Sequence, residues 1–223
     1  HFHVITLMPE VCAQYTNAGV VGRAQQRIGR SRPPITIHYY NPREYTRDPH
    51  RKVDDRPYGG GPGMVMQALP ILRAWRHAVG RKANQRHVKT LLMSPRGRRF
   101  TQRDAYDFVR DYTHLVLISG RYEGVDQRVQ HALDAEEISV GDFTLSGGEL
   151  PALSILDATA RVVPGVLGDP MSLEEARVAS GELYTRPAHI RFAGQTLSVP
   201  EVLRSGDHAQ IDAWRAARGH GGA

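Results

Sequence analysis

Short apolar and β-branched runs alternate with segments of helical spacing along residues 2–163, and this alternation constrains the fold more than any other feature. Helices between successive strands favour parallel pairing, because a parallel connection must cross back over the sheet. The pattern therefore predicts an α/β domain with a mainly parallel sheet. Strands are expected at 2–7, 35–40, 88–93, 114–119 and 136–140, and helices at 9–29 with a break near 17–19, at 67–79, 101–112, 122–133 and 148–163.

The character of the chain changes after Gly168. Residues 169–187 are polar and small with little periodicity, which is typical of a flexible linker. Residues 199–218 have helical spacing that breaks near Ser205, and Asp207 is expected to cap the second of the two helices. We therefore expect a main domain at 1–168, a linker at 169–187 and a small helical domain at 188–223.

Composition narrows the class of protein. Of the 223 residues, 40% are hydrophobic, which is enough for one sizeable core. No apolar run is long enough to cross a bilayer, and the N-terminal residues resemble a strand rather than a signal peptide, so a cytoplasmic protein without a membrane partner is expected. Cys12 is the single cysteine and cannot form an internal disulfide. The net charge of +6 rests almost wholly on arginine, which is typical of a polyanionic partner but also follows from codon usage alone.

Three unusual loops follow predicted strands: "MSPRGRRFTQ", "SGRYEGVDQR" and "VGDFTLSGGELP". Ligands of parallel α/β sheets bind beyond the carboxyl ends of the strands, so these loops are expected to form a site. The chain has no Gly-Lys pair, no G-x-G-x-x-G after a strand and no H-E-x-x-H, which argues against a P-loop, a dinucleotide fold and a zinc site. Glycines, backbone amides, carboxylates and arginines suffice for methyl transfer from S-adenosylmethionine, whose methyl group is already activated.

Two further features of these loops have simpler interpretations. Ser146 lacks the first glycine of a nucleophile elbow, so we expect it to cap the following helix with Glu149 completing a capping box. The stretch "DRPYGGGPGM" at residues 55–64 is dense in glycine, which indicates a sharp turn or a close approach by a phosphate, a cofactor, a base or another part of the chain.

The motifs "VDDRPYGGGPGMVM", "SPRG", "SGRYEGVDQRV", "SVGDFTLSGGELPA", "PGVLG", "YTRP" and "VPEVLRSGDHAQIDAWR" occur in this order. In this ordered set, which covers nearly the whole chain, the sequence resembles the bacterial tRNA (guanine-N1)-methyltransferases of the TrmD family. The resemblance implies a SPOUT-type fold with a deep trefoil knot, and a homodimer with its active site at the subunit interface. It also implies methylation of N1 of guanosine 37 in tRNA after guanosine 36, with S-adenosylmethionine as methyl donor and Mg²⁺ as a candidate further cofactor without a recognisable ligand motif.

The resemblance also assigns site residues. The cofactor would lie against three loops, at Leu92, Met93, Ser94 and Pro95, at Gly120, Arg121, Tyr122 and Glu123, and at Val140, Gly141, Asp142, Phe143, Thr144, Leu145, Ser146, Gly147 and Gly148. The acceptor guanosine and the base before it would lie against Asp54, Gly59, Gly60, Gly61, Pro62 and Gly63, for which a structural turn is the alternative.

The resemblance places the catalytic groups near and beyond the end of the last long helix. Arg161 would stabilise charge on O6 of guanine, whereas without the resemblance it is a helix-end arginine that favours the macrodipole. The general base aligns with Glu175 in a linker shorter than usual, and Asp169 and Glu174 are the alternatives. The chain also ends earlier than the family pattern, so part of a tRNA-binding domain is expected to be absent.

Two other functions remain open from the sequence. One is an RNA-binding protein of the same fold whose catalysis has decayed, which the unusual linker suggests. The other is a related SPOUT enzyme that acts on a different base or RNA. Clusters of arginine at residues 43–56 and 96–103 are candidate phosphate contacts in each case, with a solvated face as the simpler interpretation.

Overall fold

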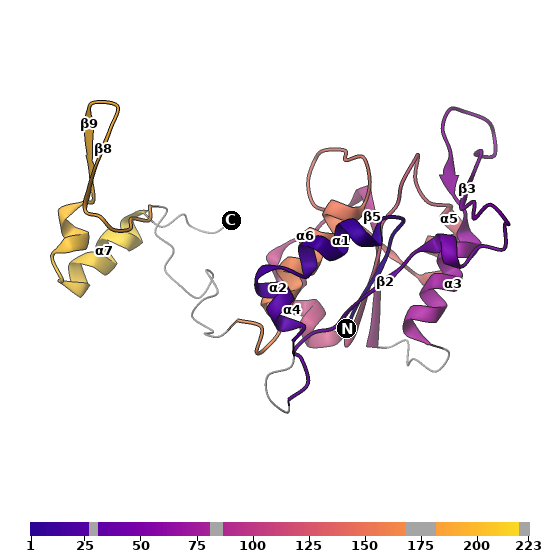
Figure 1. Ribbon diagram of the computed structural model, residues 1–223, viewed down its shortest axis with the longest axis horizontal. Coiled ribbons are helices and arrows are strands. Elements are labelled where there is room, and N and C mark those ends of the chain that lie inside the picture. Colours follow the sequence, from indigo (N-terminus) through magenta and orange to yellow (C-terminus); the bar gives the residue numbers. More distant parts are fainter. Residues whose placement is uncertain (27–30, 81–86, 168–181, 219–223) are drawn as a thin grey trace. The chain divides into compact units, whose positions relative to one another are not determined.

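The computed structural model describes residues 1–26, 31–80, 87–167 and 182–218 (Figure 1). The chain divides into two compact units, His1–Leu167 and Gly168–Ala223. The candidate linker residues Asp169, Glu174 and Glu175 lie outside the described residues.

A five-stranded parallel sheet forms the centre of the first unit, in the order β2-β1-β6-β5-β7. The strands are β1 (Phe2–Ile5), β2 (Ile37–Tyr40), β5 (Val88–Arg99), β6 (His114–Ile118) and β7 (Glu136–Ser139). Each predicted strand is present, and the prediction of a mainly parallel sheet is confirmed. A separate two-stranded antiparallel ribbon pairs β3 (Asp54–Asp55) with β4 (Val65–Met66).

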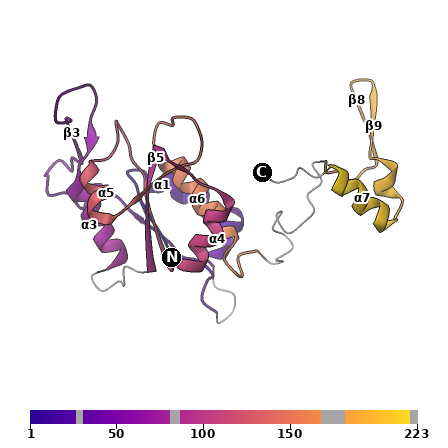
Figure 2. The ribbon, with the colours of Figure 1, turned by 180° about the vertical axis from the view of Figure 1, so that it is seen from behind.

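Helices cover both faces of this sheet (Figures 1 and 2). One face carries α1 (Pro9–Thr16), α2 (Gly19–Ala24), α4 (Gln102–Asp111) and α6 (Glu149–Arg161); the other carries α3 (Ala68–Val79) and α5 (Gln127–Leu133). Alternate residues of β6 enter the two cores: Leu115 and Leu117 pack in one, Val116 and Ile118 in the other. Burial on both faces explains why the central strands are continuous apolar runs.

Strand β5 is longer than predicted because it continues past an irregularity. It pairs with β7 on both sides of the shift, with Met93 and Arg98 both opposite Ile138. Residues 94–97 therefore bulge out of the ladder at the edge where the sheet ends. Gly97 permits this, since a Cβ there would stand 2.3 Å from the backbone nitrogen of Ile138. The bulge places Ser94 and Pro95 beyond the sheet rather than in it.

The second unit contains a β-hairpin that the sequence did not predict. Strands β8 (His189–Phe192) and β9 (Gln195–Ser198) pair antiparallel around Ala193 and Gly194, both at positive φ. Alanine is unusual in such a turn, where Asn-Gly is the common signal, which explains why the hairpin was missed. The 3₁₀ helix η5 (Glu201–Arg204) and α7 (His208–Arg218) follow.

The predicted break near Ser205 is confirmed, since it separates η5 from α7. The predicted cap of α7 by Asp207 is confirmed as well. The side chain of Asp207 accepts a hydrogen bond from the backbone nitrogen of Gln210 at 3.1 Å. Among the described residues, none of the helices combines the length and the apolar character that a membrane span requires.

Candidate functional site

Three loops converge beyond the carboxyl ends of β5, β6 and β7 and enclose a cavity of about 240 Å³, here called the loop pocket. This is close to the lower end of the usual size of ligand pockets, about 300–1,000 Å³. The lining residues are Met93, Ser94, Pro95, Gly120, Arg121, Tyr122, Glu123, Gly124, Ile138, Ser139, Val140, Phe143, Thr144, Leu145, Ser146, Gly147, Gly148 and Pro151. The loop pocket thus lies at the edge of the sheet where the sequence predicts a site.

Most of the predicted cofactor residues line the loop pocket, and three do not. Leu92 is buried in the core between the sheet and α3. The side chain of Asp142 is 91% exposed and pairs with Arg99, which lowers the pKa of that carboxyl group. Gly141 lies under the ring of Phe143, where a Cβ would overlap the ring.

The loop pocket is also lined by four residues that were not predicted from the sequence: Gly124, Ile138, Ser139 and Pro151. The position of Ile138 and Ser139 at the end of a predicted strand is the signal that could have identified them.

Two of the loops are joined by close backbone contacts at Gly148. Its nitrogen donates a hydrogen bond to the carbonyl oxygen of Gly120 at 2.8 Å, and its own carbonyl oxygen accepts one from Ser119 Oγ at 3.2 Å. A Cβ on Gly148 would stand 2.8 Å from the Cα of Ser119. Glycine is therefore required at this position, because two backbone segments of the same chain approach each other closely here. This contact fixes one wall of the loop pocket.

An ion pair joins a half-buried arginine of this wall, Arg121, to a buried glutamate behind it. Glu149, the first residue of α6, stands with its Oε2 3.0 Å from Arg121 Nε, and its Oε1 accepts a hydrogen bond from Thr6 Oγ1 at 2.9 Å. The side chain of Glu149 is 5% exposed. The pair also affects the nearby Cys12 thiol: burial of the thiol itself, followed by the negative charge of Glu149, raises the pKa of Cys12 to about 11.

These contacts correct the prediction that Ser146 and Glu149 form a capping box. The N-cap of α6 is Gly148, and it makes no side-chain cap hydrogen bond. The carboxylate of Glu149 does not reach back to the cap, because it is held by Thr6 and Arg121. Ser146 lies instead in the exposed loop that lines the pocket.

The glycine-rich stretch packs against the middle loop of the pocket. The backbone nitrogen of Glu123 donates to the carbonyl oxygen of Met64 at 3.0 Å, and that of Met66 donates to Gly124 at 2.9 Å. Gly63 has a φ of +79°, and a Cβ there would lie 2.4 Å from the carboxylate of Glu123. Gly63 therefore lies directly against Glu123, a side chain that lines the loop pocket.

The other residues predicted to contact the acceptor guanosine lie in the β3–β4 ribbon and in the loop that joins its two strands. Gly59, Gly60 and Gly61 have positive φ, and nothing lies within 4 Å of where their Cβ atoms would be. They form an exposed loop together with Pro62. Asp54 lies half-buried at the start of β3, opposite Met66.

Arg161 lies away from the loop pocket within the first unit. It is the last residue of α6, whereas Gly148 precedes the first turn, so the length of the helix separates them by about 20 Å. Its charge acts on Tyr15 of α1, where it opposes the rise in the pKa of Tyr15 that burial and Asp157 produce. A single copy of this unit therefore does not bring Arg161 to the loop pocket.

Within the described ranges, no three His, Cys, Asp or Glu side chains converge as a metal site would require.

A parallel sheet with a pocket at its carboxyl edge is typical of α/β proteins that bind a ligand. Comparison with known proteins identifies the family. The family model for tRNA (Guanine-1)-methyltransferase TrmD matches residues 1–221. A tRNA (guanine-N(1)-)-methyltransferase of Pseudoalteromonas atlantica is 46% identical over 218 residues, covering 96% of this chain and 78% of the relative. Its counterpart in Methylococcus capsulatus is 47% identical over 218 residues, covering 96% and 82%. The chain belongs to the TrmD family.

Proposed function

We propose that this protein methylates N1 of guanosine 37 in tRNA that carries guanosine at position 36, with S-adenosylmethionine as methyl donor. The observation that carries the proposal is the loop pocket, formed at the carboxyl edge of the sheet by the three loops that bear the family motifs. The names of the relatives support the guanine N1 of tRNA as the acceptor. A tRNA substrate in turn favours a cytoplasmic location.

The chemistry of the loop pocket fits an adenosine-type methyl donor. Apolar side chains such as Met93, Ile138 and Leu145 offer contact to a flat base, and the glycine-rich walls bring backbone groups close to it. S-Adenosylmethionine supplies an activated methyl group on a positively charged sulfur. We propose that the segments around the pocket form the trefoil knot of SPOUT enzymes.

The acceptor must lose its N1 proton as the methyl group arrives. We propose that a linker carboxylate, Glu175, accepts that proton, with Asp169 and Glu174 as the alternatives. Removal of the proton leaves negative charge on O6 of guanine, and the guanidinium of Arg161 is suited to stabilise it with two parallel N–H donors. A positioned base contributes about 10²–10⁴-fold to rate, so the identity of this carboxylate matters.

The position of Arg161 favours a site built from two copies of the chain. Val11 and Tyr15 of α1 and Leu150 of α6 are 47%, 50% and 61% exposed, which leaves an apolar surface on the helices that lead to Arg161. We propose that a second copy covers this surface and brings its own Arg161 to the loop pocket. An interface of this kind would explain why one copy holds the pocket and the arginine apart.

The direct test uses labelled S-adenosylmethionine and a tRNA transcript with G36 and G37. We expect label at N1 of G37, and no product when G37 is replaced by adenosine. Unchanged incorporation into the adenosine transcript would instead indicate an enzyme for another base. Tight binding of donor and tRNA without methyl transfer would indicate an RNA-binding protein.

The linker assignment has its own test. Glu175→Gln should reduce single-turnover methylation by about 10²-fold or more, while Asp169→Asn should have little effect. The reverse pattern would assign the base to Asp169.

A further inference from the structure

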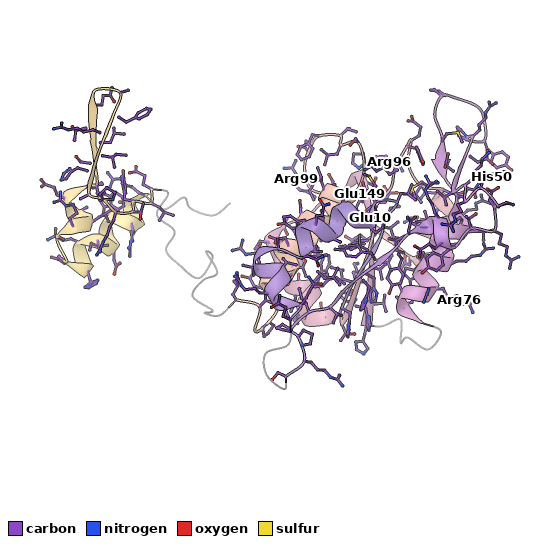
Figure 3. The ribbon with its side chains drawn as sticks, in the orientation of Figure 1. Glu10, His50, Arg76, Arg96, Arg99 and Glu149 are labelled. Atoms are coloured by element: carbon purple, nitrogen blue, oxygen red, sulfur yellow. The ribbon has the colours of Figure 1, made fainter. Side chains whose placement is uncertain are left out.

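The ion pair of Arg121 and Glu149 is placed where its charges can act on a ligand of the loop pocket. Arg121 is the only positively charged side chain among the described lining residues, and Glu123 is the only negatively charged one. The side chain of Arg121 is 28% exposed and borders the pocket, whereas Glu149 lies behind it at 5%. Glu149 comes from the N-terminus of α6, and its label stands next to that of Glu10 of α1 in Figure 3.

Contacts from other segments hold the pair in this arrangement. Thr6 Oγ1 donates to Glu149 and accepts a hydrogen bond from the backbone nitrogen of Met8 at 3.0 Å, so Glu149 is tied to the end of β1. The terminal nitrogen of Arg121 contacts the sulfur of Met8. A Cβ on Gly147 would stand 2.5 Å from Glu149 Oε2 and 2.6 Å from Arg121 Nε. Gly147 thus leaves room for the pair immediately behind the wall of the pocket.

The contact between the two side chains is an attraction of charges rather than a directed hydrogen bond. Neither Arg121 Nε nor Glu149 Oε2 makes a hydrogen bond within the described residues, although the two atoms are 3.0 Å apart. A contact of this kind in a water-poor setting acts mainly through charge, because solvent screens it weakly.

We propose that Glu149 is a positioning and charge-neutralising residue, which holds Arg121 in the wall of the loop pocket and cancels its charge toward a cationic methyl donor. The inference rests on the proposed function, since it concerns binding of S-adenosylmethionine. An unpaired guanidinium beside the pocket would repel a sulfonium group, whereas the neutral pair does not. The pair thereby sets the preference of the pocket between the charged donor and its uncharged product.

The experiment measures binding by calorimetry for S-adenosylmethionine and S-adenosylhomocysteine, which differ by one methyl group and one positive charge. Glu149→Gln leaves Arg121 unpaired, so we expect the preference for S-adenosylmethionine over S-adenosylhomocysteine to fall about three- to tenfold. Sinefungin, which carries an amino group in place of the methyl-sulfonium, should follow S-adenosylmethionine. This third ligand separates the effect of charge from that of the methyl group.

Arg121→Gln provides the opposing variant. It breaks the same ion pair but removes the positive charge, so the preference for the cationic donor should not fall. The double variant Glu149→Gln/Arg121→Gln leaves neither charge buried alone, and we expect it to restore the wild-type preference. Glu10→Gln is the matched control, because Glu10 is an exposed glutamate in the first turn of α1 and should leave the preference unchanged.

A purely structural role gives a different pattern. Equal weakening of all three ligands in Glu149→Gln, or the same loss of preference in Arg121→Gln as in Glu149→Gln, would overturn the proposal. Thermal melting of each variant identifies any that fail to fold. If Glu149→Gln alone does not fold, a lower preference for S-adenosylmethionine in Arg121→Gln than in the double variant would overturn the proposal. If the wild-type protein binds none of the three ligands, the proposed function fails instead.

Discussion

Gly63 is a residue at which local backbone geometry and the candidate site meet. Its φ of +79° favours glycine, and any side chain there would displace the carboxylate of Glu123, which lines the loop pocket. We expect Gly63→Val to reduce tRNA methylation by more than about tenfold, while the strain in this exposed loop lowers unfolding stability by only about 1–2 kcal/mol. Initial rates with saturating tRNA and a thermal melt measure the two effects.

Gly59 offers a matched control for this prediction. Its φ of +83° imposes the same backbone strain, but nothing lies within 4 Å of where its Cβ would be. Gly59→Ala and Gly63→Ala should therefore lower stability alike, and only Gly63→Ala should slow methylation. Equal rates in the two variants would show that contact with Glu123 has no functional role.

Individual residues differ in how far their roles could be predicted from the sequence. The glycines of the loop pocket were identifiable, because dense glycine after a strand indicates close approach whatever the partner. The role of Glu149 was not, since its partner Thr6 lies 143 residues away in the chain. The local spacing of Ser146 and Glu149 matched a capping box, and a distant contact took precedence over it.

At the scale of elements, the bulge in β5 supplies Ser94 and Pro95 to the lining of the loop pocket. A Cβ at Gly97 would stand 2.3 Å from the nitrogen of Ile138 and 2.4 Å from the carbonyl carbon of Glu137, which are backbone atoms of β7. We expect Gly97→Ala to destabilise the first unit by about 1–3 kcal/mol, because the two strands must separate. Urea unfolding followed by the fluorescence of Trp75, in a Trp214→Phe background, measures the change.

Gly120→Ala is the comparison for this variant. A Cβ there would meet only the side-chain atom Cγ2 of Val125, at 3.2 Å, and a side chain can move where a backbone cannot. The loss of stability should be clearly smaller than for Gly97→Ala. Similar losses in the two variants would mean that β7 can shift to accept a side chain at Gly97.

The elements that could be predicted from the sequence are those whose own residues show a clear apolar pattern. The central strands are buried on both faces, so their apolar runs were visible, and α3, α4 and α6 had clear helical spacing. The extension of β5 consists of polar and basic residues that continue the strand only because β7 pairs with them again. Strand pairing across such an irregularity is a tertiary property, which periodicity along one segment cannot show.

At the scale of the whole first unit, stability should depend on pH through His3. Burial, followed by the charges of His114 and His38, lowers the pKa of His3 from 6.5 to about 3. The ring of His3, on β1, makes hydrogen bonds to both neighbouring strands. Its Nε2 lies 2.9 Å from Nδ1 of His114 on β6, and its Nδ1 lies 3.1 Å from the hydroxyl of Tyr40 on β2. The unfolded chain therefore binds a proton that the folded chain excludes.

The sign of this dependence follows from the lowered pKa. The contribution of His3 is complete above its ordinary pKa of 6.5 and is lost as pH falls from there toward 3, at up to about 1.4 kcal/mol per pH unit. Urea unfolding at several pH values, with Trp75 as reporter in a Trp214→Phe background, measures the slope. His3→Phe should flatten it, and His131→Gln, at an exposed position on α5, should not. An unchanged slope in His3→Phe would assign the dependence to other groups.

Arg161 lies at the far end of α6 from the loop pocket, so the proposed active site requires an arginine from elsewhere. If a second copy supplies this arginine, Arg161→Ala should reduce turnover far more than affinity for S-adenosylmethionine. Gly148→Ala should do the opposite, because its Cβ would press on the backbone of Ser119 and Gly120. Each homodimer then lacks one of the two parts of every site.

Co-expression of these two variants with different tags, followed by purification through both tags, isolates the mixed dimer. In a site built from two copies, one of its two sites combines an intact loop pocket with the partner's intact arginine, so activity should return to about half that of the wild type. In a site built within one copy, each subunit would carry one defect and activity would stay at the level of the variants. Recovery of activity in the mixed dimer therefore distinguishes a shared site from a self-contained one.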